Sequence, residues 1–154
     1  MADAQGCIDY SIKGTLILNE GSYRGPVSEV VTYYTIIANR DLYNSSGTRL
    51  ADFRAIIQQD RSNLHKSGIA DKIYDTFDDG SPNIMAEDFD GYFTTLNRRT
   101  MLSTDQYYQH CSDSIPNSIL EKRIVQGKVM AAMLQVTVFR HPNGNLAVLL
   151  APVG

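Results

Sequence analysis

The Asn143-Gly144 pair constrains the fold most, because it stands between two runs of β-branched and aliphatic residues near the C-terminus. Asn-Gly is a strong short-range indication of a tight β-turn, since both residues accept a positive φ angle. The flanking runs, residues 130–140 and 146–150, have the composition of strands. The sequence therefore predicts a β-hairpin from Met133 to Leu150.

Both faces of this predicted hairpin are apolar. Leu134, Val136 and Val138 point to one side of the first strand, and Met133 and Phe139 point to the other. A strand pair of this kind is either central in a sheet that is covered on both faces or part of an oligomer contact. We therefore expect cover by helices or by a second copy of the chain, as in a homodimer formed through the sheet.

Residues before the hairpin divide into one strand and several helices. Residues 8–18 alternate apolar and polar side chains, which predicts a strand interrupted at Gly14. Pro26 suits the first turn of a helix, and apolar residues at helical spacing extend that predicted helix to Ala38. A second helix is predicted from Arg49 to Lys66, with Gly68 as its C-terminal cap.

The second half of the chain continues the helical pattern after one irregular stretch. Residues 69–84 show little periodicity and are rich in Asp, which predicts a long acidic loop. Further helices are predicted over residues 85–101, 104–111 and 116–126.

Together these elements predict one α+β domain over residues 1–154. Its small antiparallel sheet consists of the N-terminal strand and the C-terminal β-hairpin, and this sheet packs against several central helices.

The composition argues against two classes of partner, nucleic acids and membranes. The net charge is −3, with 14 Lys and Arg against 17 Asp and Glu, which argues against nucleic-acid binding. No apolar run approaches the roughly 20 residues of a membrane span, so we expect no membrane partner.

The chain has two cysteines, Cys7 and Cys111. They are either unrelated thiols or a disulfide that closes a long loop. A bridge would favour a periplasmic or secreted protein, whereas free thiols would favour the cytoplasm.

The densest polar cluster on a predicted helix surrounds Asp60. Asp60 lies on the same helical face as Phe53 and Ile56, at the border of the buried stripe. Burial there would raise its pKa unless a partner compensates, and a raised pKa suits a general acid or base. One interpretation is a catalytic pair of Asp60 and His65 supported by Arg61. The structural alternative is that Asp60 accepts a hydrogen bond from a buried backbone N–H or pairs with an arginine of another helix, and so holds the long loop in place.

The acidic stretch suggests a binding surface. Residues 71–90 contain seven acids and one lysine, and such asymmetry can mark a surface for a basic protein partner or a cation. An EF-hand register that starts at Asp75 fails, because it places Phe77 and Ala86 at ligand positions. A looser cation site is an alternative, but solvated charge is the commoner case, so we expect no metal. The predicted partner-binding residues are Asp75, Asp78 and Asp79.

Phosphate-binding, dinucleotide-binding, zinc-protease and nucleophile-elbow motifs are absent from the sequence, and no cofactor is expected. The leading hypothesis is a non-enzymatic protein-binding or inhibitory domain that uses the acidic loop. The alternative is a small hydrolase-type enzyme with an Asp/His acid-base pair.

Overall fold

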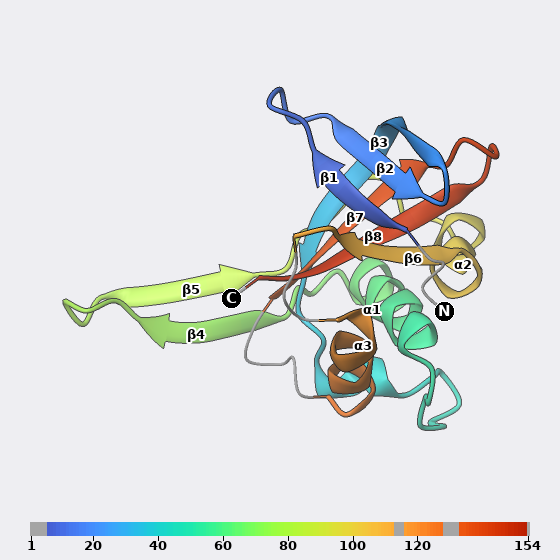
Figure 1. Ribbon diagram of the computed structural model, residues 1–154. Helices are drawn as coiled ribbons and strands as arrows, with labels where there is room; N and C mark the ends of the chain where they lie inside the picture. Colours follow the sequence, from blue (N-terminus) through green and yellow to red (C-terminus); the bar gives the residue numbers. More distant parts are fainter. Residues whose placement is uncertain (1–5, 113–115, 128–132, 154) are drawn as a thin grey trace.

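A computed structural model of the chain describes residues 6–112, 116–127 and 133–153, and its main body is a closed barrel of six strands (Figure 1). The strand order around the barrel is β1-β2-β3-β7-β8-β6. Most neighbours are antiparallel, but β6 pairs in parallel with both β1 and β8 and so closes the ring. The barrel strands are β1 (Cys7–Tyr10), β2 (Leu16–Glu20), β3 (Tyr23–Thr35), β6 (Gln106–His110), β7 (Met133–Arg140) and β8 (Leu146–Val153).

The remaining elements lie outside the barrel. Helices α1 and α3 lie together against one side of it, whereas the β4–β5 hairpin projects away from it (Figure 1). These elements are a 3-10 helix (Asn39–Leu42), α1 (Phe53–Ser67), β4 (Lys72–Thr76), β5 (Pro82–Ala86), α2 (Leu96–Thr104) and α3 (Asn117–Val125). None of the helices in the described ranges combines the length and the apolar character that crossing a bilayer requires.

The predicted small antiparallel sheet with several central helices is therefore wrong, and the largest error is the predicted helix from Pro26 to Ala38. Most of that segment belongs to β3, the longest strand. Val27 and Val31, four residues apart, fit both a helical and a strand spacing, and β-branched and aromatic residues favour the strand. An irregularity between Glu29 and Val31 shifts the register, which obscures the alternation.

Three other predicted elements are also corrected. Residues 8–18 form two strands with a turn at Gly14, whose φ is 83°. The predicted acidic loop over residues 69–84 and the start of the predicted helix over residues 85–101 form the β4–β5 hairpin instead. The predicted helix over residues 104–111 is strand β6, which the barrel needs for closure.

Helices α1 and α3 confirm two predictions. Asp52 caps the start of α1 by accepting a hydrogen bond from the Arg54 N–H, and Gly68 ends the helix in a left-handed conformation. The helix predicted over residues 116–126 is α3.

The C-terminal hairpin is confirmed, but its turn has a positive φ at Gly144 alone and not at both residues of the Asn-Gly pair. Its loop closes with a hydrogen bond from the His141 N–H to the Asn145 carbonyl. Gly144 has a φ of 92°, whereas no non-glycine residue in the described ranges has a positive φ. Asn143 therefore does not use the left-handed conformation on which the prediction rested.

Two hydrophobic clusters explain why the hairpin is apolar on both faces. One cluster fills the barrel interior with side chains from all six strands: Ile8, Leu16, Leu18, Val27, Tyr108, Phe139, Ala147 and Leu149. The other cluster places Leu134, Val136 and Val138 against residues of the three helices. Cover on both faces thus comes from the chain itself, and the homodimer stays a prediction.

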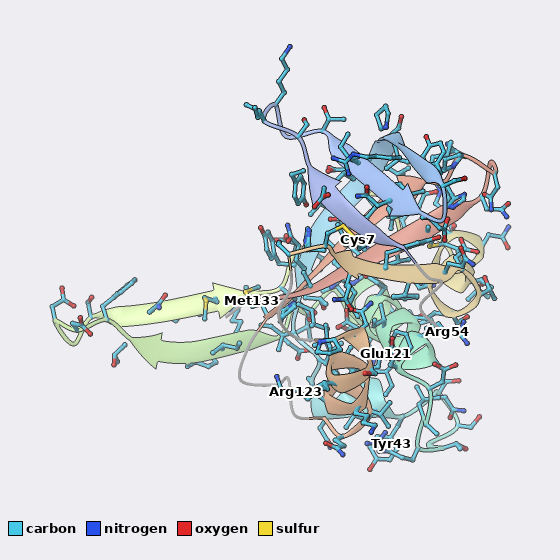
Figure 2. All side chains as sticks on the ribbon, in the orientation of Figure 1. Cys7, Tyr43, Arg54, Glu121, Arg123 and Met133 are labelled. Carbon is cyan, nitrogen blue, oxygen red and sulfur yellow. A yellow bond between two sulfur atoms is a disulfide. The ribbon has the colours of Figure 1, made fainter. Side chains whose placement is uncertain are left out.

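Cys7 and Cys111 form a disulfide that ties the first strand to the end of β6 (Figure 2). The two residues are 104 positions apart in sequence. Beside the bridge, the Cys111 N–H donates to the Ile8 carbonyl at 2.9 Å. Of the two cysteine alternatives, the disulfide is therefore correct.

Candidate functional site

A buried cluster of charged side chains surrounds Arg61 of α1, whose side chain is 0% exposed. Its guanidinium donates to the Asp60 carboxylate at 3.1 Å, to Asp90 at 2.9 Å and to Glu87 at 3.2 Å. It also donates to Thr35 Oγ1 and to the Asp88 carbonyl. The five N–H donors of the guanidinium thus all have acceptors, as a buried arginine requires.

The ring of Tyr33 completes the surroundings of Arg61. The guanidinium carbon lies 4.1 Å from the ring centroid, which is within the range of a cation–π contact. Tyr33 is itself buried on β3, so Arg61 contacts the strand layer as well as the carboxylates. We refer to Thr35, Asp60, Arg61, Glu87 and Asp90 as the Arg61 cluster.

The Thr35 hydroxyl lies between two carboxyl groups of this cluster. It contacts Asp60 Oδ2 and lies 2.8 Å from Glu87 Oε1, while it accepts a hydrogen bond from Arg61. One hydroxyl carries a single proton, so it donates to only one of the two carboxyl groups. The other carboxyl group must be protonated to hydrogen-bond to the same oxygen.

The pKa values follow this geometry. Burial raises the pKa of Asp60 to about 7, although the nearby Arg61 charge acts in the opposite direction. Burial also raises the pKa of Glu87 to about 7, and the negative charge of Asp60 adds to the effect. The cluster therefore contains more carboxyl groups than its arginine can keep ionised.

Asp90 differs from these two acids. Burial favours its neutral form, but hydrogen bonds from the Phe93 N–H, His65 and Arg61 outweigh burial and lower its pKa. His65 Nε2 lies 3.0 Å from Asp90 Oδ1, the same oxygen that Arg61 contacts. Asp90 thus connects His65 to the cluster.

The three predicted catalytic residues therefore come together. Asp60 bonds Arg61 directly, and His65 reaches Arg61 through Asp90. Their catalytic role stays a prediction, and the burial of Asp60 and Arg61 weighs against it, because a substrate would have to reach fully covered side chains. Asp60 pairs with Arg61 of its own helix α1 and not, as the structural alternative has it, with an arginine of another helix.

The cluster joins the base of the β4–β5 hairpin to the barrel and α1. Glu87 follows β5 directly, and its Oε2 accepts a hydrogen bond from the N–H of Asp71, the residue before β4, at 2.7 Å. The Asp88 N–H donates to the Tyr34 carbonyl of β3 at 2.8 Å, and the Asp88 carboxylate accepts a hydrogen bond from the Tyr34 N–H at 2.9 Å. The hairpin therefore projects from a rigid polar base.

The hairpin beyond this base is exposed. Tyr74 is 73% exposed and pairs across the strands with Ile84, which is 54% exposed. Phe77 begins the turn and is also 54% exposed. Asp78 and Asp79 occupy the turn itself and are exposed, and their role in partner binding stays a prediction.

Asp75, the third predicted partner-binding residue, lies in β4 opposite Asn83. Its side chain is outside the part of the chain that the structure describes. The aromatic and aliphatic side chains around these acids were not predicted as binding residues. The β-branched and aromatic residues of 72–76 and 82–86, on either side of an Asp-Gly pair, are a hairpin signal that could have identified them.

A second polar group, also missed from the sequence, lies at one end of the barrel. Glu20 contacts His141 Nε2 at 2.7 Å and accepts a hydrogen bond from the Tyr108 hydroxyl at 2.7 Å. His141 Nδ1 accepts the Asn143 N–H, so both ring nitrogens have partners. A cleft of about 430 Å³ beside this group has Glu20 and Arg54 in its wall. The bonds tie the β7–β8 turn to β2.

Comparison of the chain with protein-family models, with curated proteins and with solved structures finds no match.

Proposed function

We propose that this protein is a non-enzymatic binding protein that docks a basic segment of a partner protein onto the β4–β5 hairpin. The observation that carries the proposal is the projection of this hairpin from the barrel with Tyr74, Phe77 and Ile84 exposed (Figure 1). Exposed apolar side chains that are grouped on one element are typical of interaction sites.

The charge of the hairpin supports a basic partner. Within residues 72–86, which form the hairpin, the sequence contains three acids, Asp75, Asp78 and Asp79, against the single lysine Lys72. Asp78 and Asp79 place two of these acids beside Phe77 at the exposed turn. Aromatic contacts would supply most of the affinity, while the acids would select a cationic segment and accelerate association.

The hairpin also offers backbone groups for binding. β4 and β5 form a two-stranded sheet, so each has an outer edge that pairs with no strand in the described ranges. An extended peptide can add to such an edge through main-chain hydrogen bonds. A basic partner segment in extended conformation would form main-chain hydrogen bonds with the strand edge and ion pairs with the acids of the turn.

A phage-displayed library of random peptides, selected on the immobilised full chain, tests the proposal. We expect the selected peptides to be rich in Lys and Arg and to contain apolar residues. Their affinity should fall at least tenfold for the double variant Tyr74→Ser, Phe77→Ser, and it should weaken as the salt concentration rises.

Ile119→Ser is the matched control, because Ile119 is an exposed apolar residue on α3, away from the hairpin. This variant should bind the peptides as the wild type does. Equal binding of the peptides to the wild type and to the hairpin variant, with unchanged circular dichroism spectra, would overturn the proposal.

We also infer that the protein works in an oxidising compartment, either the periplasm or outside the cell. The disulfide between Cys7 and Cys111 supports this inference, because such bridges persist mainly where thiols are not kept reduced.

A further inference from the structure

Three aspartates meet at the base of the β4–β5 hairpin although they come from separate segments. Asp41 belongs to the 3-10 helix, Asp60 to α1, and Asp71 precedes β4. One carboxylate oxygen from each lies within 4.8 Å of the other two. Asp41 and Asp60 are buried, and the Asp71 side chain is 22% exposed.

An unsatisfied oxygen in this group points to a ligand. Asp60 Oδ2 contacts Thr35 and Arg61, but Asp60 Oδ1 is buried and has no hydrogen-bond partner among the residues that the structure describes. A buried carboxylate oxygen without a partner is costly, because it has lost its hydration without compensation. A cation bound at Oδ1 would remove this cost.

The charges around the three aspartates also favour a bound cation, because the acids outnumber the basic groups. Glu87 and Asp90 lie nearby, which gives five carboxyl groups against the guanidinium groups of Arg40 and Arg61. Arg40 compensates only in part: its Nη2 lies 3.4 Å from Asp71 Oδ2 and 3.9 Å from Glu87 Oε2. A divalent cation would offset most of the excess negative charge.

We propose that Asp41, Asp60 and Asp71 bind one divalent cation of the kind that prefers oxygen ligands, Ca²⁺ or Mg²⁺. Two oxygens on opposite sides of such an ion are separated by twice the metal–oxygen distance, about 5 Å for Ca²⁺ and about 4 Å for Mg²⁺. The spacing of the three carboxylates fits this range.

The remaining bonds of the aspartates orient them for this role. Asp41 accepts hydrogen bonds from the Ala38 N–H at 2.8 Å and from the Asn63 amide at 2.9 Å. Such bonds fix a ligating carboxylate and are typical of the residues behind a metal ligand. The cation would join the 3-10 helix, α1 and the hairpin base, and would hold the hairpin at a fixed angle to the barrel.

Calorimetric titration of the chelator-treated full chain with CaCl₂, and separately with MgCl₂, tests the site. We expect one ion per chain for at least one of the two salts. Asp71→Asn should weaken binding at least tenfold, because it removes one ligand charge while the side-chain volume is kept. Asp78→Asn is the matched control, since Asp78 is an exposed acid of the hairpin turn, and it should leave binding unchanged.

Thermal unfolding gives a second measurement. The bound ion should raise the melting temperature of the wild type above its value at equal ionic strength in NaCl, and should not do so for Asp71→Asn. Absence of binding by both ions at millimolar concentration would overturn the proposal, and the excess charge would then be balanced by protons. Binding that is lost in Asp78→Asn and kept in Asp71→Asn would also overturn it, and would place the ion at the hairpin turn.

Discussion

At the residue scale, the most consequential side chain is Arg61. It is fully buried and contacts Asp60, Glu87 and Asp90, which belong to α1 and to the segment after β5. A buried ion pair often contributes little net stability, but removal of one partner leaves the other charges without compensation. The ion pairs of Arg61 therefore add little net stability, but loss of Arg61 would leave several buried carboxyl groups without a cation.

We expect Arg61→Met to lower the free energy of unfolding by roughly 3–5 kcal/mol, because several buried carboxyl groups lose their cation. Urea denaturation followed by circular dichroism measures this loss. Arg54→Met is the control, since the Arg54 side chain is 40% exposed and pairs with the exposed Asp52; it should cost at most about 1 kcal/mol. Equal losses in the two variants would contradict a special role for Arg61.

The sequence predicts one part of this cluster and cannot predict the rest. Asp60 stands at the border of an apolar helical stripe, so its burial near a charged partner follows from helix periodicity. Glu87 and Asp41 come from other elements, and their approach to Asp60 depends on where the barrel places α1. No local pattern indicates that placement, and Glu87 was assigned to a helix that in fact begins only at Leu96.

At the scale of elements, four loops of the chain share one turn geometry. Each closes with a hydrogen bond from the first residue's N–H to the fifth residue's carbonyl, and each has a glycine with positive φ at its fourth position. These loops are Ser11–Thr15, Asn44–Thr48, Phe77–Ser81 and His141–Asn145. This geometry combines a type I turn with a left-handed residue, for which glycine is the preferred choice.

The shared turn explains which strands were predictable. Asn143-Gly144 is a familiar hairpin pair, so the C-terminal hairpin was found. Asp79-Gly80 has the same place in its loop, but the many acids around it suggested an irregular segment. Strands β3 and β6 were missed for another reason: short apolar runs fit helix and strand spacing equally, and only pairing in the barrel decides between them.

We expect Gly144→Ala to lower the free energy of unfolding by about 1–2 kcal/mol, because an L-residue at a φ of 92° is strained. Space is not the cause, since a Cβ there would meet no atom within 4 Å. Gly91→Ala is a matched control, because it has the same open space without a positive φ, and it should be neutral or slightly stabilising. Thermal denaturation of both variants measures the difference; equal effects would contradict the strain.

At the scale of the whole molecule, the disulfide and β6 close the barrel together. β1 has its antiparallel partner β2 next to it in sequence, but its other neighbour, β6, begins at Gln106. The Cys7–Cys111 bridge lies at this distant contact and restricts the unfolded chain over a separation of 104 residues.

We expect the double variant Cys7→Ser, Cys111→Ser to lose about 2–5 kcal/mol of stability, because a long loop in the unfolded state is no longer closed. Guanidinium denaturation of the variant and of the wild type measures the loss. Addition of a reductant should bring the wild type to the midpoint of the variant and leave the variant unchanged. A wild-type midpoint that is the same with and without reductant would contradict a stabilising bridge.

The parallel pairing of β6 has a consequence for synthesis on the ribosome. β1 and β2 can form a hairpin early, but the other edge of β1 stays unpaired until β6 has been translated, about a hundred residues later. Translation of these residues takes roughly 5–20 seconds at ordinary elongation rates. An open strand edge is a site of unwanted association. The growing chain therefore passes through a period in which another nascent chain, or a chaperone, can occupy the place that β6 later takes.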